Sequence, residues 1–356
     1  MKPLLQYSAV VLLVISNAGC SMKSTPKVVQ QSTQISTAAT ISPTVVIVSS
    51  LEPTDTSTPI VKPSFRGIIA FASASRKYTS LALLDLKVGG IQSLPTMVLA
   101  SSPSWSPDGQ WLAFVGSSPD DQHSDIYKIR IDGSELIRLT NINPQGKGNV
   151  TWSPDGRFIA YSYQDKVSGI AVVNADENTT QVLTDVSGNA YSPTWSPKSN
   201  QIAYLYVEKL GAPIVLVVMD ADGKNTKLLK EFPFAWGGNV DWSPDGKWLA
   251  IVYGKAPEST NVVCSDIYLI RPDGSDLTRL TELTTLSMCA EYVVWSPDGK
   301  YLAFVGRNIT GGQTNIMNKG SQIYIMDLAS KNIFPVTNEQ DWSIDKIDWN
   351  YTVDLK

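Results

Sequence analysis

Three carboxylates occupy positions from which acid–base chemistry could be done. Asp241, Glu291 and Asp348 each lie within a few residues of a repeated tryptophan, in segments expected to be inner strands. Paired carboxylates that flank a glycosidic bond are the machinery of glycosidases, so these residues would suit a lyase or glycosidase that acts on a polysaccharide. The sequence does not show that any two of them converge.

Other catalytic chemistry has little support in the residue types. The single histidine, His123, lies in the polar segment 117–125 and is expected to be an exposed loop residue. One histidine leaves little room for a histidine-rich metal site or a hydrolytic triad. A peptidase of the prolyl-oligopeptidase kind would need a Gly-x-Ser-x-Gly segment, which the chain lacks. We therefore expect no catalytic residue, metal or cofactor, and keep peptidase and polysaccharide chemistry as alternatives.

Four further acids recur in one fixed context. The pentapeptide WSPDG stands at 105–109, 152–156, 242–246 and 295–299, and a degenerate copy, WSPKS, at 195–199. Proline presets the second turn position, aspartate suits the third, and glycine accepts a left-handed backbone. Each copy therefore predicts a hairpin turn whose aspartate is structural. In the degenerate copy we expect the least regular turn, with Asn200 taking the left-handed angle.

The elements that carry these turns are short strands. Hydrophobic residues alternate with period two between the turns, which indicates hairpins in an all-β fold. The repeat is marked by six tryptophans at intervals of 47, 43, 47, 53 and 54 residues, each long enough for four strands: Trp105, Trp152, Trp195, Trp242, Trp295 and Trp349. These spacings predict four-stranded antiparallel blades.

The two ends of the repeat region complete one another. Three strand-like runs precede Trp105 without a first strand, whereas 345–351 is a first strand without the rest of a blade. The prediction is an all-β, six-bladed β-propeller whose C-terminal strand joins the N-terminal blade. Closure of this kind leaves no open edge between the first and last blades.

The repeat unit resembles that of the TolB-type six-bladed propeller family. In that family WSPDG is followed by LAF, IY, DG and LT, which here are residues 112–114, 126–127, 132–133 and 139–140. The resemblance covers the chain from about residue 65 to its end. It implies the propeller fold over 65–356, and it is weak evidence for function because proteases and binding proteins share the repeat.

The N-terminal residues resemble a bacterial lipoprotein signal. Lys2 is followed by the apolar run 9–16 and then by NAGC, which ends at Cys20. The resemblance implies a signal peptide over 1–19 and a lipid on Cys20. A plain secretory signal is the alternative. Between Cys20 and residue 64, half of the residues after the cysteine are Ser, Thr or Pro, a composition expected to form a disordered tether.

The two remaining cysteines form an even pair in a chain expected to be exported. Cys264 precedes the third strand of one blade and Cys289 the first strand of the next, so both should emerge on the same face. We expect a disulfide between them, with two separate thiols as the alternative.

The longer loops should all open on the face opposite the WSPDG turns. They place five aromatic residues near the mouth of the predicted channel, namely Phe234, Trp236, Tyr191, Tyr292 and Trp342. Rigid aromatics are common binding anchors, although they could instead pack the loops together. The hypothesis is a lipid-anchored, monomeric scaffold of the cell envelope that binds a protein, peptide or glycan through this face.

The charge of the chain narrows the choice of partner. Its formal net charge is −4, and residues 64–356 carry 25 basic against 31 acidic side chains. Nucleic-acid binding is therefore not expected.

Overall fold

The structure is a computed structural model of the whole chain, and it describes residues 64–74, 79–96, 98–117, 123–141, 147–164, 167–233, 238–255, 264–286, 288–308, 320–338 and 343–351. All of them belong to the compact unit Ile60–Lys356. The predicted signal peptide, Cys20 and most of the tether lie outside the described residues. Within those residues no helix has the length and apolar character needed to cross a membrane.

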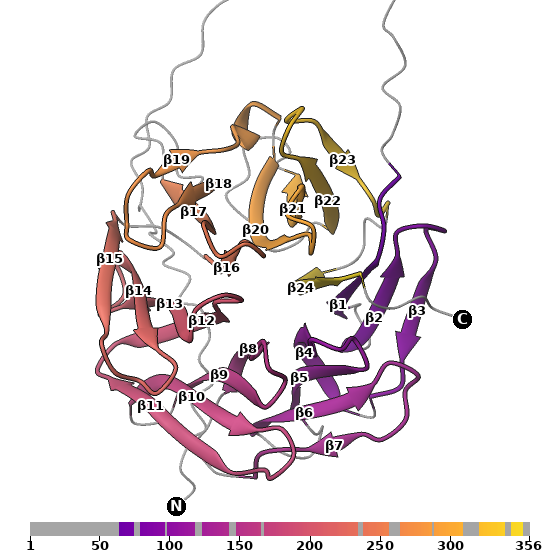
Figure 1. Cartoon of the computed structure of the whole chain (residues 1–356). Helices are drawn as coiled ribbons and strands as arrows, with labels where there is room; N and C mark the ends of the chain where they lie inside the picture. The colour runs from indigo at the N-terminus through magenta and orange to yellow at the C-terminus, as the bar shows by residue number, and fades with distance from the viewer. Residues whose placement is uncertain are drawn as a thin grey trace, which may run out of the picture. The chain divides into compact units, whose positions relative to one another are not determined.

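The described residues form six four-stranded antiparallel sheets arranged as blades around a ring, as predicted (Figure 1). Blade 1 contains β24 (Ser343–Asn350), β1 (Ile68–Ala74), β2 (Thr79–Asp85) and β3 (Ile91–Leu94). Blade 2 contains β4 (Leu99–Trp105), β5 (Trp111–Ser117), β6 (Ser124–Arg130) and β7 (Ile137–Arg138). Blade 3 contains β8 (Lys147–Trp152), β9 (Phe158–Gln164), β10 (Ser168–Asn174) and β11 (Thr180–Val186).

The second half of the ring repeats this order. Blade 4 contains β12 (Asn189–Trp195), β13 (Gln201–Val207), β14 (Ile214–Asp220) and β15 (Lys227–Phe232). Blade 5 contains β16 (Val240–Trp242), β17 (Leu249–Lys255), β18 (Cys264–Ile270) and β19 (Thr278–Arg279). Blade 6 follows the short 3-10 helix η1 (Leu283–Leu286) and contains β20 (Met288–Trp295), β21 (Tyr301–Asn308), β22 (Ser321–Asp327) and β23 (Ile333–Pro335).

The ring is closed by its two ends. Strand β24 pairs antiparallel with β1, with Ile68 opposite Asn350 and Phe71 opposite Ile347. The indole nitrogen of Trp349 also donates to the backbone oxygen of Arg66, at 3.0 Å. The sequence prediction that the last strand completes the first blade is confirmed.

The hydrophobic core lies between blades as well as within them. One cluster joins Val305 and Ile323 of blade 6 to Phe71 and Ile347 of blade 1. Another joins Val115 of blade 2 to Trp152 of blade 3. Burial of apolar surface is the main favourable term in folding, so each blade depends on its neighbours for stability.

The WSPDG segments are turns, and their aspartates are structural as predicted. In the first copy the Ser106 hydroxyl donates to Asp108 at 2.5 Å, and the Gly109 amide donates to the Ser106 carbonyl at 2.9 Å. The glycine has a φ of +70°, a conformation that costs glycine little. The other three copies repeat these bonds.

The degenerate copy is less regular, but the predicted role of Asn200 is wrong. Neither Ser199 nor Asn200 has a positive φ. The Ser196 hydroxyl instead accepts from the Ser199 amide at 3.1 Å, and the Gln201 amide donates to the Ser199 carbonyl at 2.8 Å. Serine at the glycine position is accommodated by this different hydrogen bonding, so no left-handed residue is needed.

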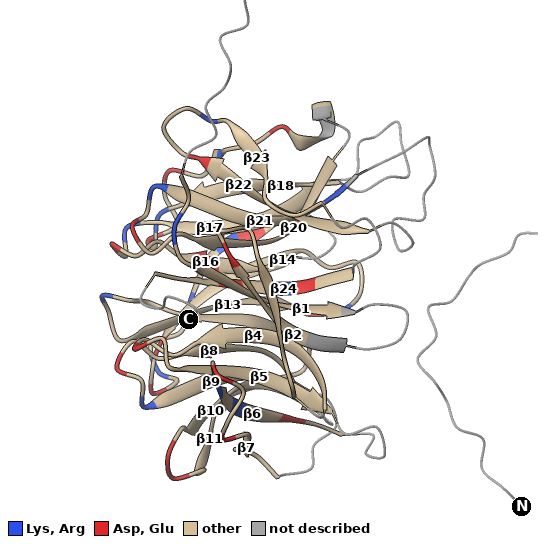
Figure 2. Ribbon diagram, turned by 90° about the vertical axis from the view of Figure 1, so that its right-hand side faces the viewer, with Lys and Arg blue, Asp and Glu red and all other residues tan. Residues whose placement is uncertain are grey.

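The face that carries the WSPDG turns is rich in charged side chains. Figure 2 views the ring from the side and shows charged residues gathered along the face that carries the WSPDG turns. Oppositely charged side chains lie close together there, for example Lys247 and Asp245, whose charged atoms are 3.4 Å apart. Exposed ion pairs of this kind contribute little stability. The geometry of this face is therefore determined mainly by the hydrogen-bonded turns.

We expect truncation after Asn338 to cause global unfolding or aggregation. It removes β24 and leaves the edge of β1 without a partner, so a local loss is not expected. The measurement is the solubility and thermal melting of the truncated chain, with truncation after Tyr351 as the control that keeps β24. A soluble shortened chain that melts cooperatively would contradict the closing role of β24.

Candidate functional site

One repeated position on the innermost strands supplies hydrogen bonds between blades. The residue before each repeated tryptophan lies on an innermost strand, and these residues are Ser104, Thr151, Thr194, Asp241, Val294 and Asp348. Three of them reach the backbone amide of a tryptophan in the next blade. The Trp105 amide donates to Asp348 at 2.7 Å, the Trp152 amide to Ser104 at 3.3 Å, and the Trp295 amide to Asp241 at 2.9 Å. These bonds join neighbouring inner strands.

A second level of contacts lies three residues before the tryptophans. Asn239 and Val293 exchange two hydrogen bonds of 2.8 Å between blades 5 and 6. The Ser102 amide donates to Asp345 at 3.1 Å, between blades 2 and 1. Ser102 has a φ of +52° and lies where the pairing of β4 and β5 shifts register. Such a bulge redirects a side chain from the sheet, here towards the neighbouring inner strand.

Lys346 is the cationic centre of the channel. Its ammonium donates to the carbonyl of Val150 on the innermost strand of blade 3. Burial lowers the pKa of Lys346, while the nearby carboxylates of Asp348, Asp241 and Asp345 favour its charged form. One lysine therefore faces three acids from two blades.

The pKa values of two of these acids are raised. Desolvation in the channel wall raises the pKa of Asp241 to about 7, and the charge of Asp348 adds to this effect. Burial also raises the pKa of Asp348, against the opposing influence of Lys346. Asp241 and Asp348 thus interact electrostatically across the channel, a convergence that the sequence left open.

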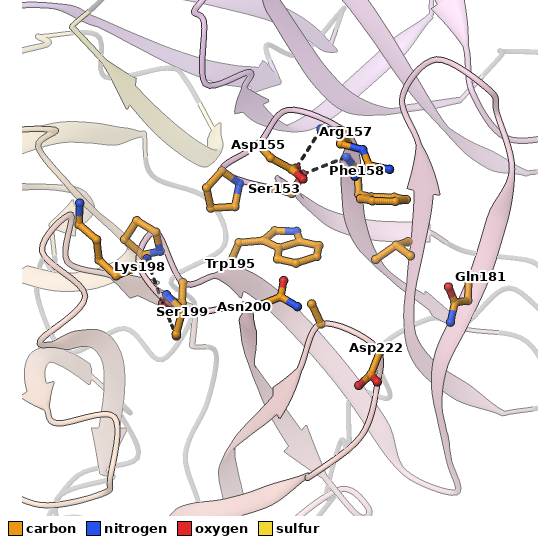
Figure 3. Close-up of a pocket in the computed structure, with 15 residues that line it drawn as sticks. Ser153, Asp155, Arg157, Phe158, Gln181, Trp195, Lys198, Ser199, Asn200 and Asp222 are labelled. Atoms are coloured by element: carbon orange, nitrogen blue, oxygen red, sulfur yellow. Dashed lines mark hydrogen bonds between the residues drawn. The ribbon is translucent and has the colours of Figure 1, made fainter.

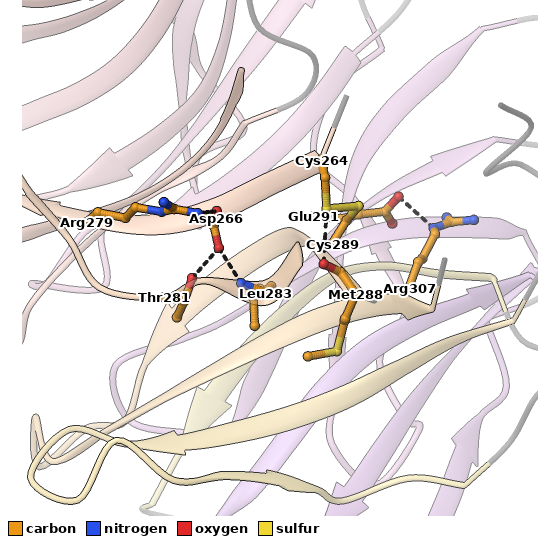
Figure 4. The surroundings of a disulfide bond; sticks show 9 residues. All are labelled: Cys264, Asp266, Arg279, Thr281, Leu283, Met288, Cys289, Glu291 and Arg307. Atoms are coloured by element: carbon orange, nitrogen blue, oxygen red, sulfur yellow. Dashed lines mark hydrogen bonds and ion pairs between the residues drawn. A yellow bond between two sulfur atoms is a disulfide. The ribbon is translucent and has the colours of Figure 1, made fainter. Parts of the chain in front are cut away.

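Glu291 does not join this pair. Its carboxylate lies 2.6 Å from the guanidinium of Arg307 on the adjacent strand (Figure 4). The third acid considered as a catalytic candidate is therefore held in an ion pair within blade 6. Asp345 and Lys346 take part in the channel cluster instead, and neither was singled out from the sequence.

Cys264 and Cys289 are bonded to each other in the structure, with their Cα atoms 5.0 Å apart (Figure 4). The bond links β18 of blade 5 to β20 of blade 6. Beside it, Asp266 accepts from Arg279 at 2.7 Å and from Thr281 at 2.9 Å. The equivalent Thr140 of blade 2 donates to Asp125 at 2.7 Å, so the repeated Leu-Thr pair fastens the outer part of a blade to its third strand.

Two of the five aromatic residues predicted for the binding face are described. Tyr191 is half-buried against the core of blades 4 and 5, and burial raises its pKa to about 12. Tyr292 is half-buried on β20, where burial and the charge of Asp345 raise its pKa. Phe234, Trp236 and Trp342 lie outside the described residues. Both tyrosines pack partly against the hydrophobic core.

The repeated tryptophans are all buried, with exposed fractions of 5 to 8%. Their role is to fill the spaces between blades, since Trp152 packs with blade 2 and Trp295 with blade 5. His123 is half-buried at the start of β6, rather than exposed as the sequence suggested. In the described part of the chain no three His, Cys, Asp or Glu side chains are grouped so that they could hold a metal ion.

We expect the substitution Asp241→Asn to flatten the dependence of stability on pH. The folded state keeps the Asp241 proton up to about pH 7, whereas the unfolded chain releases it near pH 4. Stability from this group is therefore present below pH 4 and is lost as the pH rises to 7. The stability of the asparagine variant should therefore change less between pH 5 and pH 8 than that of the wild type.

The measurement is chemical denaturation at pH 5, 6, 7 and 8. Asp273→Asn is the control, because Asp273 lies in an exposed turn whose hydrogen bonds from Ser275 lower its pKa. That variant should keep the wild-type slope over this range. An equal slope in wild type and Asp241→Asn would show that Asp241 is ionised in the folded protein throughout.

Comparisons with known proteins agree with this architecture. A family model of the TolB β-propeller domain matches residues 162–347. The structure of TolB from Acinetobacter baumannii aligns with a TM-score of 0.52 and 16% identity, over 76% of this chain and 68% of that chain. At this identity the likeness shows the fold alone.

Two curated relatives share part of the chain. The uncharacterized peptidase YuxL of Bacillus subtilis (strain 168) is 30% identical over 176 residues, which are 48% of this chain and 25% of that protein. The uncharacterized protein Atu1656 of Agrobacterium fabrum is 30% identical over 178 residues, 46% of this chain and 58% of that protein. The chain thus spans between a quarter and three fifths of the length of these relatives. Because the family model covers more than half of the chain and falls on the blades described above, the chain belongs to the TolB β-propeller domain family.

Proposed function

We propose that this protein is an exported, lipid-anchored propeller that binds a partner protein or ligand at the face opposite the WSPDG turns and catalyses no reaction. The observation that carries the non-catalytic part is the use made of the channel carboxylates. The inner strands contain four acids among their described residues: Asp241, Glu291, Asp345 and Asp348. Each of them already holds a structural partner.

These partners leave little capacity for acid–base work. Asp348 accepts from the amides of Trp105 and Trp349, and Asp241 accepts from the Trp295 amide and the Thr194 hydroxyl. A general acid or base needs an oxygen within hydrogen-bond reach of the reacting group. Removing either aspartate would break contacts between blades, so we assign both to the architecture.

The proposal of a binding face is supported by the rigid strands that carry its loops. The disulfide joins blades 5 and 6 on the face where the longer loops begin. Inter-blade hydrogen bonds fix the inner strands around the channel. Binding groups held on a rigid scaffold lose little conformational entropy when a partner binds, which suits the aromatic loops predicted there.

The anchor is supported by the sequence of residues 1–64. A short apolar run ends in Ala-Gly-Cys20, and a tether rich in Ser, Thr and Pro follows. A flexible coil of this length spans roughly 35 Å, enough to hold the propeller clear of a membrane surface.

We expect Trp236→Ala to weaken partner binding at least tenfold and to leave the melting temperature nearly unchanged. A photo-cross-linking residue placed at position 236 identifies the partner in native membranes, and the same residue at position 88 is the control. Val88 is 74% exposed in the turn between β2 and β3, on the opposite face. The affinity of the purified partner is then measured for Trp236→Ala and Val88→Ala.

Two results would contradict this proposal. Equal loss of affinity in both variants would contradict the assignment of partner binding to the face opposite the WSPDG turns. Cleavage of a polysaccharide by the wild-type chain, abolished in an Asp241→Asn variant that still folds, would instead establish the channel as a catalytic site.

The anchor has a separate test. Cys20→Ala should move the protein from the membrane pellet to the soluble fraction after a high-salt wash, because the lipid would be lost. Cys264→Ala is the control and should remain in the pellet. Continued pelleting of Cys20→Ala would show that another interaction holds the chain at the membrane.

A further inference from the structure

A cavity of about 500 Å³ lies between blades 3 and 4, on the face of the WSPDG turns and not at the channel mouth. Trp195 lies at its centre, with Phe158 and Asp155 on one side and Asn200 and Asp222 on the other (Figure 3). Its size is within the range of small-molecule sites. The site is separate from the face assigned under the proposed function.

Comparison with blades 2 and 5 shows which covering side chains this cavity lacks. The aromatic residue that follows the turn in blade 2 is Trp111, and its ring is covered by Arg130 at 4.3 Å and Lys128 at 4.7 Å. In blade 5 the corresponding Trp248 is covered by Arg271 at 3.8 Å. Cations stacked in this way fill the space beside the ring.

Blade 3 lacks both covering cations on its third strand. Its aromatic residue is Phe158, and the residue paired with it is Asn174, at the place that Arg130 takes opposite Trp111. Val172 is paired with Ala160, at the place that Lys128 takes opposite Ala113. Val172 therefore lines the cavity with a short side chain.

The remaining cover is thin. The Asn174 side chain accepts from the amides of Asp176 and Glu177, which holds it in its own turn. The Arg157 guanidinium lies over the Phe158 ring, 5.4 Å from its centroid, which is farther than the corresponding cations in blades 2 and 5. Part of the Phe158 ring is thus left to the cavity.

The degenerate turn forms the opposite wall. Lys198 and Ser199 replace the Asp-Gly of the other copies, and the Ser199 hydroxyl lies 2.8 Å from that of Ser196. The two irregularities of the repeat, at 172–174 and at 198–199, therefore meet at one junction between blades.

The charges around the cavity are balanced. Arg157 and Lys198 face Asp155 and Asp222. Asp155 already accepts from Ser153 at 2.6 Å, and Asp222 pairs with Lys224 at 2.7 Å. A ligand with a net charge would gain little from such a surface.

Two amides complete the lining. Gln181 on β11 and Asn200 in the degenerate turn are both exposed, and neither side chain makes a hydrogen bond to another part of the chain that the structure describes. An amide both donates and accepts. A ligand hydroxyl also both donates and accepts, so such groups can match it.

We propose that this cavity binds a neutral saccharide. A sugar ring has an apolar face that suits the half-buried ring of Phe158, and a rim of hydroxyls that suits Gln181 and Asn200. The size of the cavity admits one or two sugar rings, and its balanced charge favours an uncharged glycan over a uronate polymer or a basic peptide.

The test is calorimetric titration of the full-length protein with cellobiose, maltose and N,N′-diacetylchitobiose. At least one disaccharide should bind saturably at one site. Gln181→Ala and Asn200→Ala should each weaken that binding at least fivefold. Gln92→Ala is the matched control, because Gln92 is an exposed glutamine on the outer strand of blade 1, and it should bind as the wild type does.

A gain-of-cover variant tests the origin of the cavity. Val172→Lys restores the cation that blade 2 carries as Lys128, so it should fill the space over Phe158 and abolish saccharide binding. Its melting temperature shows whether it folds, and the exposed Gln181 and Asn200 variants decide the proposal if it does not.

Three outcomes would overturn the proposal. One is failure of every disaccharide to bind. Another is saccharide binding that persists unchanged in Gln181→Ala, Asn200→Ala and a folded Val172→Lys. The last is binding of an arginine- or lysine-containing peptide in place of the sugars, with loss in Val172→Lys, which would make the cavity a site for a cationic side chain.

Discussion

The pairing of β24 with β1 is the contact on which the rest of the structure depends. It joins residues near opposite ends of the propeller, with Trp349 opposite Ile69 and Asp348 opposite Ala70. It also positions the Asp348 carboxylate to accept from the Trp105 amide in blade 2. The closing strand therefore fixes both its own blade and the next one, and its loss would leave blades 1 and 6 with unburied apolar surfaces.

The channel shows how such a ring uses polar residues. Acids on β16 and β24 accept backbone hydrogen bonds from neighbouring blades, and they favour the charged form of the buried Lys346. Buried charges are costly unless they are paired and hydrogen-bonded. We therefore interpret the cluster as a structural network, and we propose recognition at the loop face and at the cavity between blades 3 and 4.

The repeated part of the structure could be predicted because each repeat contains the residues that determine its turns and strands. The turns, the six blades and the closure by 345–351 were predicted from the repeated tryptophan, the Ser-Pro-Asp-Gly segments and the alternating hydrophobic pattern. Departures from the repeat were harder. The backbone at Asn200 was mispredicted because serine hydrogen bonds replaced a left-handed residue. Lys346 was missed because its importance comes from Val150 and Asp241, which are distant in sequence. The cavity was missed because it requires the register between Phe158 and Asn174.

Amide hydrogen exchange of the folded full-length chain tests the central claim, that ring closure makes the propeller one cooperative unit. The amides of β1, β24 and Trp105 should exchange only through global unfolding, as slowly as those of β21 in the middle of blade 6. Faster exchange of β24 and Trp105, at a free energy well below that of β21, would show that the ring opens locally at its seam and would contradict the account.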